Sequence, residues 1–316
     1  MRVLITGGQG FVGARLAQHL ALLNYEILVG SRFKTSASYY QLGIECATIE
    51  WENFSSIKEA CSGVDIVIHA AGMNAQDCYS DPESALYFNG VITARLIRAA
   101  IDERVKKFIY LSTAHIYGAP LCGVISETKC PQNLHPYATS HLAGEQMCLS
   151  ARQQGKIEGS VLRLSNAFGA PVHKDTNCWT LLINDLCRQA ATTGKLKLRS
   201  AGLQRRDFVS LTNVVRAVSH VMLLNPSQAG NGIFNVGGMW APRVIDVAKL
   251  IQARSSVIFG YSPEICVAEN SSDEITQDLD YCIDKLSGTG FHLLNNVTDE
   301  VDSILMYCQN FFGKNG

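Results

Sequence analysis

The sequence predicts an α/β protein with a doubly wound parallel sheet, followed by a smaller mixed α/β lobe. Two observations predict this class. Short apolar runs of strand length alternate repeatedly with segments of helical periodicity, starting at residue 3. Beyond residue 166 this alternation loosens into shorter strands and helices of varied length. Regular alternation followed by a mixed part is typical of a sheet with helices on both faces and an appended lobe.

The chain opens with a strand, a glycine turn, a helix and a second strand. Apolar runs at 3–5 and 27–29 predict buried strands, and residues 11–23 have the apolar spacing of a helix. Units of this kind form half of a mononucleotide-binding fold. We therefore expect a phosphate-binding site at the start of the helix, where free backbone amides face an anion.

Three glycines occupy the turn. Gly7, Gly10 and Gly13 form the pattern G-x-x-G-x-x-G, with Phe11 and Val12 at the start of the helix. A turn this tight needs backbone angles that a Cβ opposes, and a pyrophosphate must approach the amides closely. In this context the pattern predicts a dinucleotide cofactor bound by Gly7, Gly10, Phe11 and Val12. The alternative interpretation is a glycine-rich turn that binds nothing.

The end of the second strand bears on the choice of cofactor. An acidic residue there would accept hydrogen bonds from the adenosine ribose and favour NAD. This chain has Ser31 and Arg32 instead, a hydroxyl and a guanidinium that suit a 2′-phosphate. NADP is therefore favoured, with NAD as the alternative. The competing interpretation of Arg32 is a solvated residue at the end of a strand.

Further elements follow in the same rhythm. We expect strands at 45–49, 64–70, 107–112 and 161–164, and helices at 54–61, 81–101 and 137–154. The strand at 64–70 ends in Ala70, Ala71 and Gly72, whose small side chains would let a ribose or nicotinamide pass close by. The helix at 81–101 carries Asn89 about two turns from its start, and Asn89 is expected to contact the cofactor. A loop rich in Pro, Cys and Gly at 119–136 precedes the helix at 137–154.

The second half of the chain divides less regularly. We expect helices at 179–191, 211–224, 244–253 and 298–312, and strands at 195–198, 208–209 and 233–236. Residues 1–166 are thus expected to form a dinucleotide-binding Rossmann domain and residues 167–316 a substrate-binding lobe. Some segments of the lobe are expected to return to the Rossmann sheet.

Composition narrows the functional classes. The 316 residues are 47% hydrophobic and 17% charged, which describes a soluble globular protein with a sizeable core. A formal charge of −1 gives no electrostatic reason to bind nucleic acid or an anionic membrane. No apolar run reaches the ~20 residues of a membrane span and no signal-peptide pattern precedes the first strand, so a cytoplasmic location is expected. The eleven cysteines form no C-x-x-C pair and no metal spacing connects the histidines, so we expect no metal site.

Four stretches, taken together, resemble the extended short-chain dehydrogenase/reductase family. They are TGGQGFVG at 6–13, HAAG at 69–72, STAHIYG at 112–118 with YATSH at 137–141, and RLSN at 163–166 with RDFV at 206–209. The likeness covers nearly the whole chain and points to the nucleotide-sugar epimerases, dehydratases and reductases of the family. It implies bound NAD(P), a nucleotide-sugar substrate and, by analogy, a homodimer formed through a pair of helices.

The resemblance also implies the catalytic groups. In this family a Tyr phenol exchanges the proton at the sugar oxygen, a Ser or Thr binds the same oxygen, and a Lys four residues after the Tyr lowers its pKa and holds the ribose. Tyr137 and Thr113 match the first two, but His141 stands at the place of the Lys. A neutral imidazole can hydrogen-bond a ribose hydroxyl without supplying a permanent charge. Either Tyr137 and His141 work as a modified pair that also contacts the cofactor, or redox activity is weak or lost.

A second departure follows Thr113. Dehydratases of the family carry Asp-Glu there as proton shuttles, whereas this chain has Ala114 and His115, which argues against 4,6-dehydration. With Thr113, His115 would face the substrate as a general acid/base beside a ketone or as a group that orients a hydroxyl. The alternative is a histidine packed below the site.

Two further residues resemble those that hold the substrate's diphosphate in the family. They are Asn166 and Arg206, and an Arg fork suits phosphate because it meets two oxygens at once. Arg199 and Arg205 either assist or are ordinary surface charges. His69 is expected to be structural and to satisfy backbone groups at the end of its strand.

The leading hypothesis is an NAD(P)-dependent oxidoreductase that acts on a nucleotide-activated sugar. Within that class we favour reduction of a 4-keto sugar, because Arg32 suggests a dissociable NADP and the dehydratase carboxylates are missing. One alternative is a nucleotide-sugar epimerase with a tightly held cofactor. Another is a non-catalytic protein that binds a cofactor or nucleotide and has a regulatory role.

Overall fold

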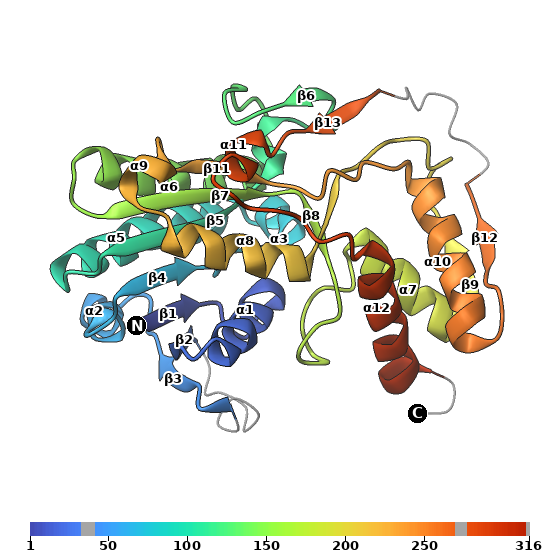
Figure 1. Cartoon of the computed structure of the whole chain (residues 1–316), viewed down its shortest axis with the longest axis horizontal. Coiled ribbons are helices and arrows are strands. Elements are labelled where there is room, and N and C mark those ends of the chain that lie inside the picture. The colour runs from blue at the N-terminus through green and yellow to red at the C-terminus, as the bar shows by residue number, and fades with distance from the viewer. Residues whose placement is uncertain (33–41, 269–276, 314–316) are drawn as a thin grey trace.

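A parallel sheet forms the centre of the molecule (Figure 1). The computed structural model describes residues 1–32, 42–268 and 277–313, and in these residues the sheet has seven strands. From one edge to the other they are β11 (Ile233–Val236), β7 (Glu158–Leu164), β5 (Lys107–Thr113), β4 (Ile66–His69), β1 (Arg2–Thr6), β2 (Glu26–Ser31) and β3 (Glu45–Thr48). Every neighbouring pair is parallel. The predicted doubly wound parallel sheet is confirmed.

The strand order changes direction at β1. From β1 the chain adds β2 and β3 toward one edge, then returns to β4 and adds β5, β7 and β11 toward the other. Open α/β sheets bind ligands at such a point, outside the carboxyl ends of the strands. The ends of β1, β2 and β4 line a cavity there.

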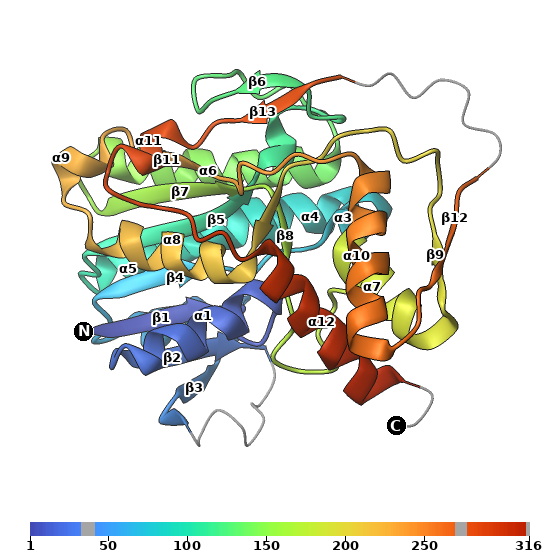
Figure 2. The same ribbon diagram turned by 45° about the vertical axis from the view of Figure 1, so that its right-hand side comes forward.

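Helices cover both faces of the sheet (Figures 1 and 2). One face carries α1 (Phe11–Leu22) and α8 (Leu211–Leu223), and the other α2 (Phe54–Cys61), α5 (Thr93–Asp102) and α6 (Pro136–Gln153). In β1, Val3 and Ile5 belong to the first core, whereas Leu4 belongs to the second. Because the strands are buried on both faces, the sequence shows continuous apolar runs rather than alternation.

The long helix predicted at 81–101 is interrupted. A short helix, α4 (Pro82–Leu86), leads into a π-helical turn, η2 (Tyr87–Ile92), before α5 begins. Asn89 lies in the π turn, where its side chain reaches both the loop after β4 and α6. Such a turn often accompanies a functional site. It adds a single residue to the helix, and the spacing of apolar residues in the sequence does not reveal so small an insertion.

Part of the chain after residue 166 has a hydrophobic core of its own, formed by α7, α10 and α12, helices that lie together on one side of the molecule in Figure 2. These helices are α7 (Leu182–Thr193), α10 (Val244–Phe259) and α12 (Val297–Phe312). Two-stranded parallel pairs join β8 (Asn166–Phe168) to β10 (Phe208–Ser210), β9 (Lys195–Lys197) to β12 (Glu264–Cys266), and β6 (Gly123–Ile125) to β13 (Leu279–Tyr281). Short helices are α3 (Ala75–Ser80), η3 (Ala114–Tyr117), α9 (Pro226–Ala229) and α11 (Asp284–Ser287). Since α8 and β11 pack on the central sheet, the domain boundary after residue 166 stays a prediction.

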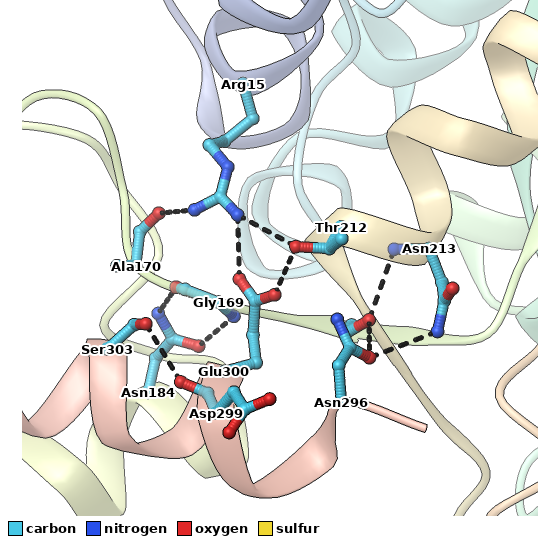
Figure 3. Close-up of polar contacts among 11 residues, drawn as sticks. Arg15, Gly169, Ala170, Asn184, Thr212, Asn213, Asn296, Asp299, Glu300 and Ser303 are labelled. Carbon is cyan, nitrogen blue, oxygen red and sulfur yellow. Dashed lines mark hydrogen bonds and ion pairs between the residues drawn. The ribbon is translucent and has the colours of Figure 1, made fainter. Parts of the chain in front are cut away.

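Arg15 of α1 ties the first helix to the later part of the chain (Figure 3). Its guanidinium lies 2.9 Å from Oε1 of Glu300 on α12 and donates to Oγ1 of Thr212 on α8 at 3.2 Å. A third hydrogen bond reaches the carbonyl of Ala170 after β8 at 3.1 Å. The helix that starts at the glycine turn is therefore anchored to three distant segments.

Within the described part of the chain, no helix is long and apolar enough to cross a membrane.

Candidate active site

The glycine turn leaves no room for side chains. Gly7 has φ +69°, and a Cβ there would lie 2.6 Å from backbone at the end of β4. A Cβ on Gly13 would lie 2.3 Å from the carbonyl oxygen of Gly7. Gly10 is the N-cap of α1 and offers no side-chain cap, so the first helical amides, those of Phe11 and Val12 among them, have no partner within the helix. This cradle fits the pyrophosphate of a dinucleotide.

A cavity of about 230 Å³ lies against this turn. It is lined by Gly7, Gln9, Gly10, Gly30, Ser31, Arg32, Trp51, Ala70, Ala71, Gly72 and Phe88. The structure thus brings together most of the predicted cofactor residues from β1, β2 and β4. The side-chain nitrogen of Gln9 is buried there and has no hydrogen-bond partner among the described residues. An unpaired buried donor beside the glycine cradle is a second feature that fits an anionic cofactor.

Arg32 stands between this cavity and a larger one. Its guanidinium carbon lies 5.9 Å from the centre of the Phe88 ring, which itself packs edge-on against Trp51. The larger cavity, about 670 Å³, shares Arg32, Trp51, Gly72 and Phe88 with the first. Its lining adds four carboxylates, those of Glu50, Glu52, Asp77 and Asp81. The surroundings of Arg32 are therefore aromatic in both cavities and also acidic in the larger one.

Tyr137 and Thr113 meet where β5 ends and α6 begins. His135 caps α6 by accepting a hydrogen bond from the backbone of Tyr137 at Nδ1, at 3.1 Å. Burial raises the pKa of the Tyr137 phenol, and a hydrogen bond with the Thr113 side chain partly opposes this rise. The structure therefore brings the two predicted catalytic hydroxyls together, with the phenol uncharged near neutral pH.

His141 lies one turn further along α6. Its ring packs edge-on against that of Tyr137, with 4.7 Å between the ring centres. Burial lowers the pKa of His141 to about 4, so the imidazole is neutral near pH 7. Nδ1 lies 3.0 Å from the phenol oxygen of Tyr110. Nε2 faces the end of β4, 3.6 Å from the place that a Cβ on Gly72 would occupy.

A buried ion pair fixes these elements below the site. Glu145, one turn after His141 on α6, is fully buried and lies 2.7 Å from Nη2 of Arg163 on β7. It also accepts a hydrogen bond at 2.5 Å from Ser112, the neighbour of Thr113. The start of α6 is thereby held against the carboxyl ends of β5 and β7, which sets the position of Tyr137 relative to Thr113.

Asn89 has protein partners rather than an open side chain. Its Oδ1 accepts from the backbone of Met73 at 3.0 Å, and its Nδ2 donates to Oγ of Ser140 at 3.0 Å. The side chain is 1% exposed and is not part of the cavity lining. It holds the loop after Gly72 against α6, and its predicted contact with the cofactor stays a prediction.

His115 lies beside Tyr137, the predicted catalytic tyrosine. It is half-buried, and its ring centre is 6.4 Å from that of Tyr137. Burial, with smaller contributions from Arg206 and His135, lowers the pKa of His115. The imidazole is therefore neutral near pH 7 and has one donor and one acceptor for a substrate.

Arg206 belongs to a third cavity of about 260 Å³. The lining consists of Gln76, Thr180, Leu182, Asp185, Leu186, Lys197, Leu198, Arg199, Ser200, Gln204, Arg206 and Val244. Three cations among amides and hydroxyls suit a phosphate-bearing ligand. Asn166 is not in this lining, because its side chain donates to the carbonyl of Asp207 at 2.8 Å. Arg205 also points elsewhere, toward the carbonyl of Ala241 at 3.0 Å.

His69 is structural, but its partners differ from those expected. Nδ1 lies 2.6 Å from the hydroxyl of Thr6 and Nε2 lies 3.0 Å from that of Thr93. The expectation of backbone partners was wrong, because the strand's own backbone groups are already used in pairing with β1 and β5. Burial lowers the pKa of His69 to about 3.

The family is decided by comparison with known proteins. The profile described as "NAD dependent epimerase/dehydratase family" matches residues 3–237. The chain belongs to this family. It is therefore an NAD(P)-dependent enzyme, and the glycine cradle and neighbouring cavity lie within the matched region.

Several members of the family are similar over most of their length. The dTDP-D-glucose 4,6-dehydratase of Homo sapiens is 29% identical over 301 residues, which cover 90% of this chain and 79% of that protein. The dTDP-6-deoxy-L-talose 4-dehydrogenase (NAD(P)(+)) of Kitasatospora kifunensis is 28% identical over 266 residues, 81% of this chain and 80% of that protein. The structure of the Thermus thermophilus UDP-glucose 4-epimerase with NAD has a TM-score of 0.81 and 20% identity, and the match covers 98% of this chain and 100% of that one.

Sequence reasoning missed several lining residues of these cavities, among them Gln9, Trp51, Phe88 and Lys197. Gln9 was part of the glycine pattern but was assigned no role, and Trp51, Phe88 and Lys197 were not singled out. Trp51 lies just beyond β3, so the rule that ligands bind at the carboxyl ends of strands could have found it. Phe88 and Lys197 reach their cavities only through tertiary packing.

Proposed function

We propose that this protein reduces a 4-keto nucleotide sugar with NADPH. The observation that carries the proposal is the uncharged pair of Tyr137 and His141. Both groups are neutral near pH 7, because burial raises the pKa of the phenol and lowers that of the imidazole to about 4. A neutral phenol is ready to give a proton, whereas oxidation of an alcohol needs a phenolate to take one.

The chain's own groups account for the proton transfer. Bound NADPH supplies the hydride that reduces the keto carbon. Tyr137 donates its phenolic proton to the carbonyl oxygen, so that one hydride and one proton together form the alcohol. Thr113, already bonded to the Tyr137 side chain, stabilises the oxygen on which negative charge develops. His115 is placed to donate or accept one hydrogen bond with a neighbouring sugar hydroxyl.

The cationic cavity supports a nucleotide sugar as the substrate class. Lys197, Arg199 and Arg206 line it together, and a diphosphate needs charge-assisted donors of this kind. The human and Kitasatospora relatives are named for dTDP-sugars, which agrees with this assignment. The Kitasatospora enzyme is named for redox chemistry at the 4-position, with either NAD or NADP. Ala114 and His115 lack the carboxylates that 4,6-dehydration would need.

NADP is the preferred cofactor within this proposal. Ser31 and Arg32 line the cofactor cavity with the unpaired amide of Gln9, and together they offer donors to a 2′-phosphate. The four carboxylates of the adjoining cavity disfavour the added negative charge of a 2′-phosphate. The preference for NADP over NAD therefore depends on the guanidinium of Arg32. An Arg32→Ala variant should bind NADPH at least about tenfold more weakly and leave NADH unchanged.

An epimerase with a tightly held cofactor is the second candidate. The hydrogen bond between Thr113 and Tyr137 favours it, since this contact lowers the pKa of the phenol and assists the oxidative half of an epimerisation. Cofactor stoichiometry separates the two reactions. A reductase oxidises one NADPH for each keto sugar consumed, whereas an epimerase returns its cofactor unchanged.

The decisive experiment follows the absorbance of NADPH with 4-keto dTDP- and UDP-sugars. We expect stoichiometric consumption that Tyr137→Phe abolishes. Tyr25→Phe is the matched control, because Tyr25 precedes β2 at the opposite end of the strands. If Tyr137→Phe binds the cofactor and changes no measured property, a non-catalytic binding role replaces the proposed reaction.

We also propose that the protein is a homodimer. A cytoplasmic location is proposed with it. Leu86, Val91 and Met147, on α4, η2 and α6, are 53%, 46% and 42% exposed. Apolar side chains gathered on neighbouring helices suit a helical interface between two copies. Light scattering of the purified chain tests this directly, and Met147→Glu should shift a dimer toward monomer.

A further inference from the structure

Two buried histidines lie in one chain of hydroxyls beneath the cofactor cavity. Thr93 donates its hydroxyl proton to the carbonyl of Asn89 at 2.7 Å, so it has no proton left for His69. His69 must therefore donate from Nε2 to the Thr93 oxygen, which lies 3.0 Å away. It follows that Thr6 donates to Nδ1 of His69, across 2.6 Å. The proton positions on the first histidine are thus fixed by its neighbours.

The proton positions on the His141 ring follow from its neighbours in the same way. The phenol of Tyr110 is 1% exposed and lies 3.0 Å from Nδ1 of His141. It approaches this closely because α6 has a glycine there: a Cβ on Gly144 would lie 2.6 Å from the Tyr110 oxygen. Thr93 is a second side-chain partner of this phenol, and its oxygen already accepts from His69. If Nδ1 of His141 carried a proton and donated it to the Tyr110 oxygen, the phenol proton would have to go to that shared Thr93 oxygen. The phenol proton is therefore assigned to Nδ1 of His141, the partner that lies at 3.0 Å.

The other ring nitrogen then carries the imidazole proton. Nε2 lies 3.6 Å from the Cβ position of Gly72, which lines the cofactor cavity. Among the described residues, no acceptor bonds to Nε2 of His141. The Tyr137 ring lies edge-to-face with the imidazole and offers it no hydrogen-bond acceptor in this packing, and Asn89 directs its Oδ1 to the backbone of Met73. The proton on Nε2 is therefore available to a ligand that passes over Gly72.

We infer that Tyr110 is a positioning residue: it holds His141 in the tautomer whose Nε2–H donates to a hydroxyl of the cofactor's ribose. This inference rests on the cofactor binding of the proposed function, and not on the identity of the sugar. A single neutral donor thus anchors the ribose without placing a positive charge beside Tyr137. The phenol of Tyr110 decides whether His141 offers a donor or an acceptor at that place.

The tautomer can be measured directly on the full chain without any ligand. Nitrogen NMR of protein labelled with ¹⁵N-histidine distinguishes a protonated ring nitrogen from a bare one, and His141→Gln identifies the signals of His141. We expect Nδ1 of His141 to be bare and Nε2 to be protonated. The reverse assignment, with Nδ1–H donating to the Tyr110 oxygen, overturns the inference.

Binding of the cofactor gives an independent test. Tyr110→Phe should weaken NADPH binding, followed by fluorescence, about fivefold to tenfold, because His141 loses the partner that fixes its donor. In the His141→Lys background the same substitution should have little effect, since an ammonium needs no tautomer. Equal weakening in both backgrounds would show a merely structural role for Tyr110. Tyr25→Phe is the matched control: Tyr25 precedes β2 at the opposite end of the strands, and its effect should be small and equal in both backgrounds.

The two proposals fail in different ways. If no keto sugar is turned over, the proposed reaction falls, while the tautomer and the NADPH titrations still test Tyr110. If the tautomer is reversed, the role of Tyr110 falls, while sugar reduction stands. The tautomer is read from the unmodified chain, and the His141→Gln variant serves only to assign its signals.

Discussion

A lysine at position 141 tests whether the uncharged pair sets the direction of catalysis. The rings of Tyr137 and His141 lie 4.7 Å apart, so His141→Lys would place an ammonium close to the phenol. Two unit charges at that separation attract by about 3.5 kcal/mol at an effective dielectric constant of about 20. Burial cancels roughly half of this, because the ammonium also loses its water. The remainder shifts the balance from phenol to phenolate by about tenfold to thirtyfold.

The assay compares both directions of the reaction across neutral and alkaline pH. Oxidation of the product alcohol should rise about tenfold at neutral pH in His141→Lys, and its pH profile should move to lower pH, because the phenolate forms more readily. Reduction of the keto sugar should change by less than about threefold. His141→Gln is the matched control, since its amide keeps a donor without a charge. If His141→Lys and His141→Gln give the same ratio of oxidation to reduction, the reasoning from charge is refuted.

Three further predictions concern binding and stability. Gly13→Ala would push a Cβ to 2.3 Å from a backbone oxygen of the glycine turn, so dinucleotide binding should be lost in titrations, and retained affinity would contradict the cradle. His69 and His141 have pKa values lowered to about 3 and about 4, so the unfolded chain binds more protons as pH falls below about 6.5, and stability should drop. At pH 5 each histidine should lower the free energy of unfolding, measured by urea denaturation, by roughly 2 kcal/mol. His69→Asn should halve the loss of stability between neutral pH and pH 5. Glu300→Gln breaks a contact that is 4% exposed and should lower the free energy of unfolding by about 1–3 kcal/mol, whereas Glu264→Gln, at an exposed pair, should change it by less than about 0.5 kcal/mol.

The cofactor half of the molecule could be predicted because its signals are local. Val3, Leu4 and Ile5 are all apolar, and successive side chains of a strand point to opposite faces of the sheet. The run therefore indicates a strand that is buried on both faces. The spacing of Gly7, Gly10 and Gly13 predicts a turn that is too tight for a Cβ atom, and the structure shows the same restriction. The resemblance to the family predicted Thr113 and Tyr137 as catalytic groups; the structure shows a side-chain hydrogen bond between them, and their catalytic role stays a prediction.

Other features depend on residues that are far apart in the sequence. The strand β6 lies in a segment without local strand signal and exists because β13, more than a hundred residues later, pairs with it. The π turn at Asn89 and the contact between Arg15 and Glu300 likewise reflect packing rather than periodicity. The hydrogen bond from the Asn166 amide to the carbonyl of Asp207 is another such contact, and the predicted contact of Asn166 with the substrate stays a prediction.

The sequence by itself determined the sheet, the glycine cradle and the presence of a histidine four residues after Tyr137. Each of these is encoded in neighbouring residues, through apolar period, the absence of a Cβ or motif spacing. Only the tertiary structure shows the surroundings of that histidine. Burial lowers the pKa of His141 to about 4, and β5 brings the phenol of Tyr110 against α6, 3.0 Å from Nδ1 of His141. Hydrogen-bond partners and desolvation arise when distant elements pack together, so they cannot be obtained from local pattern alone.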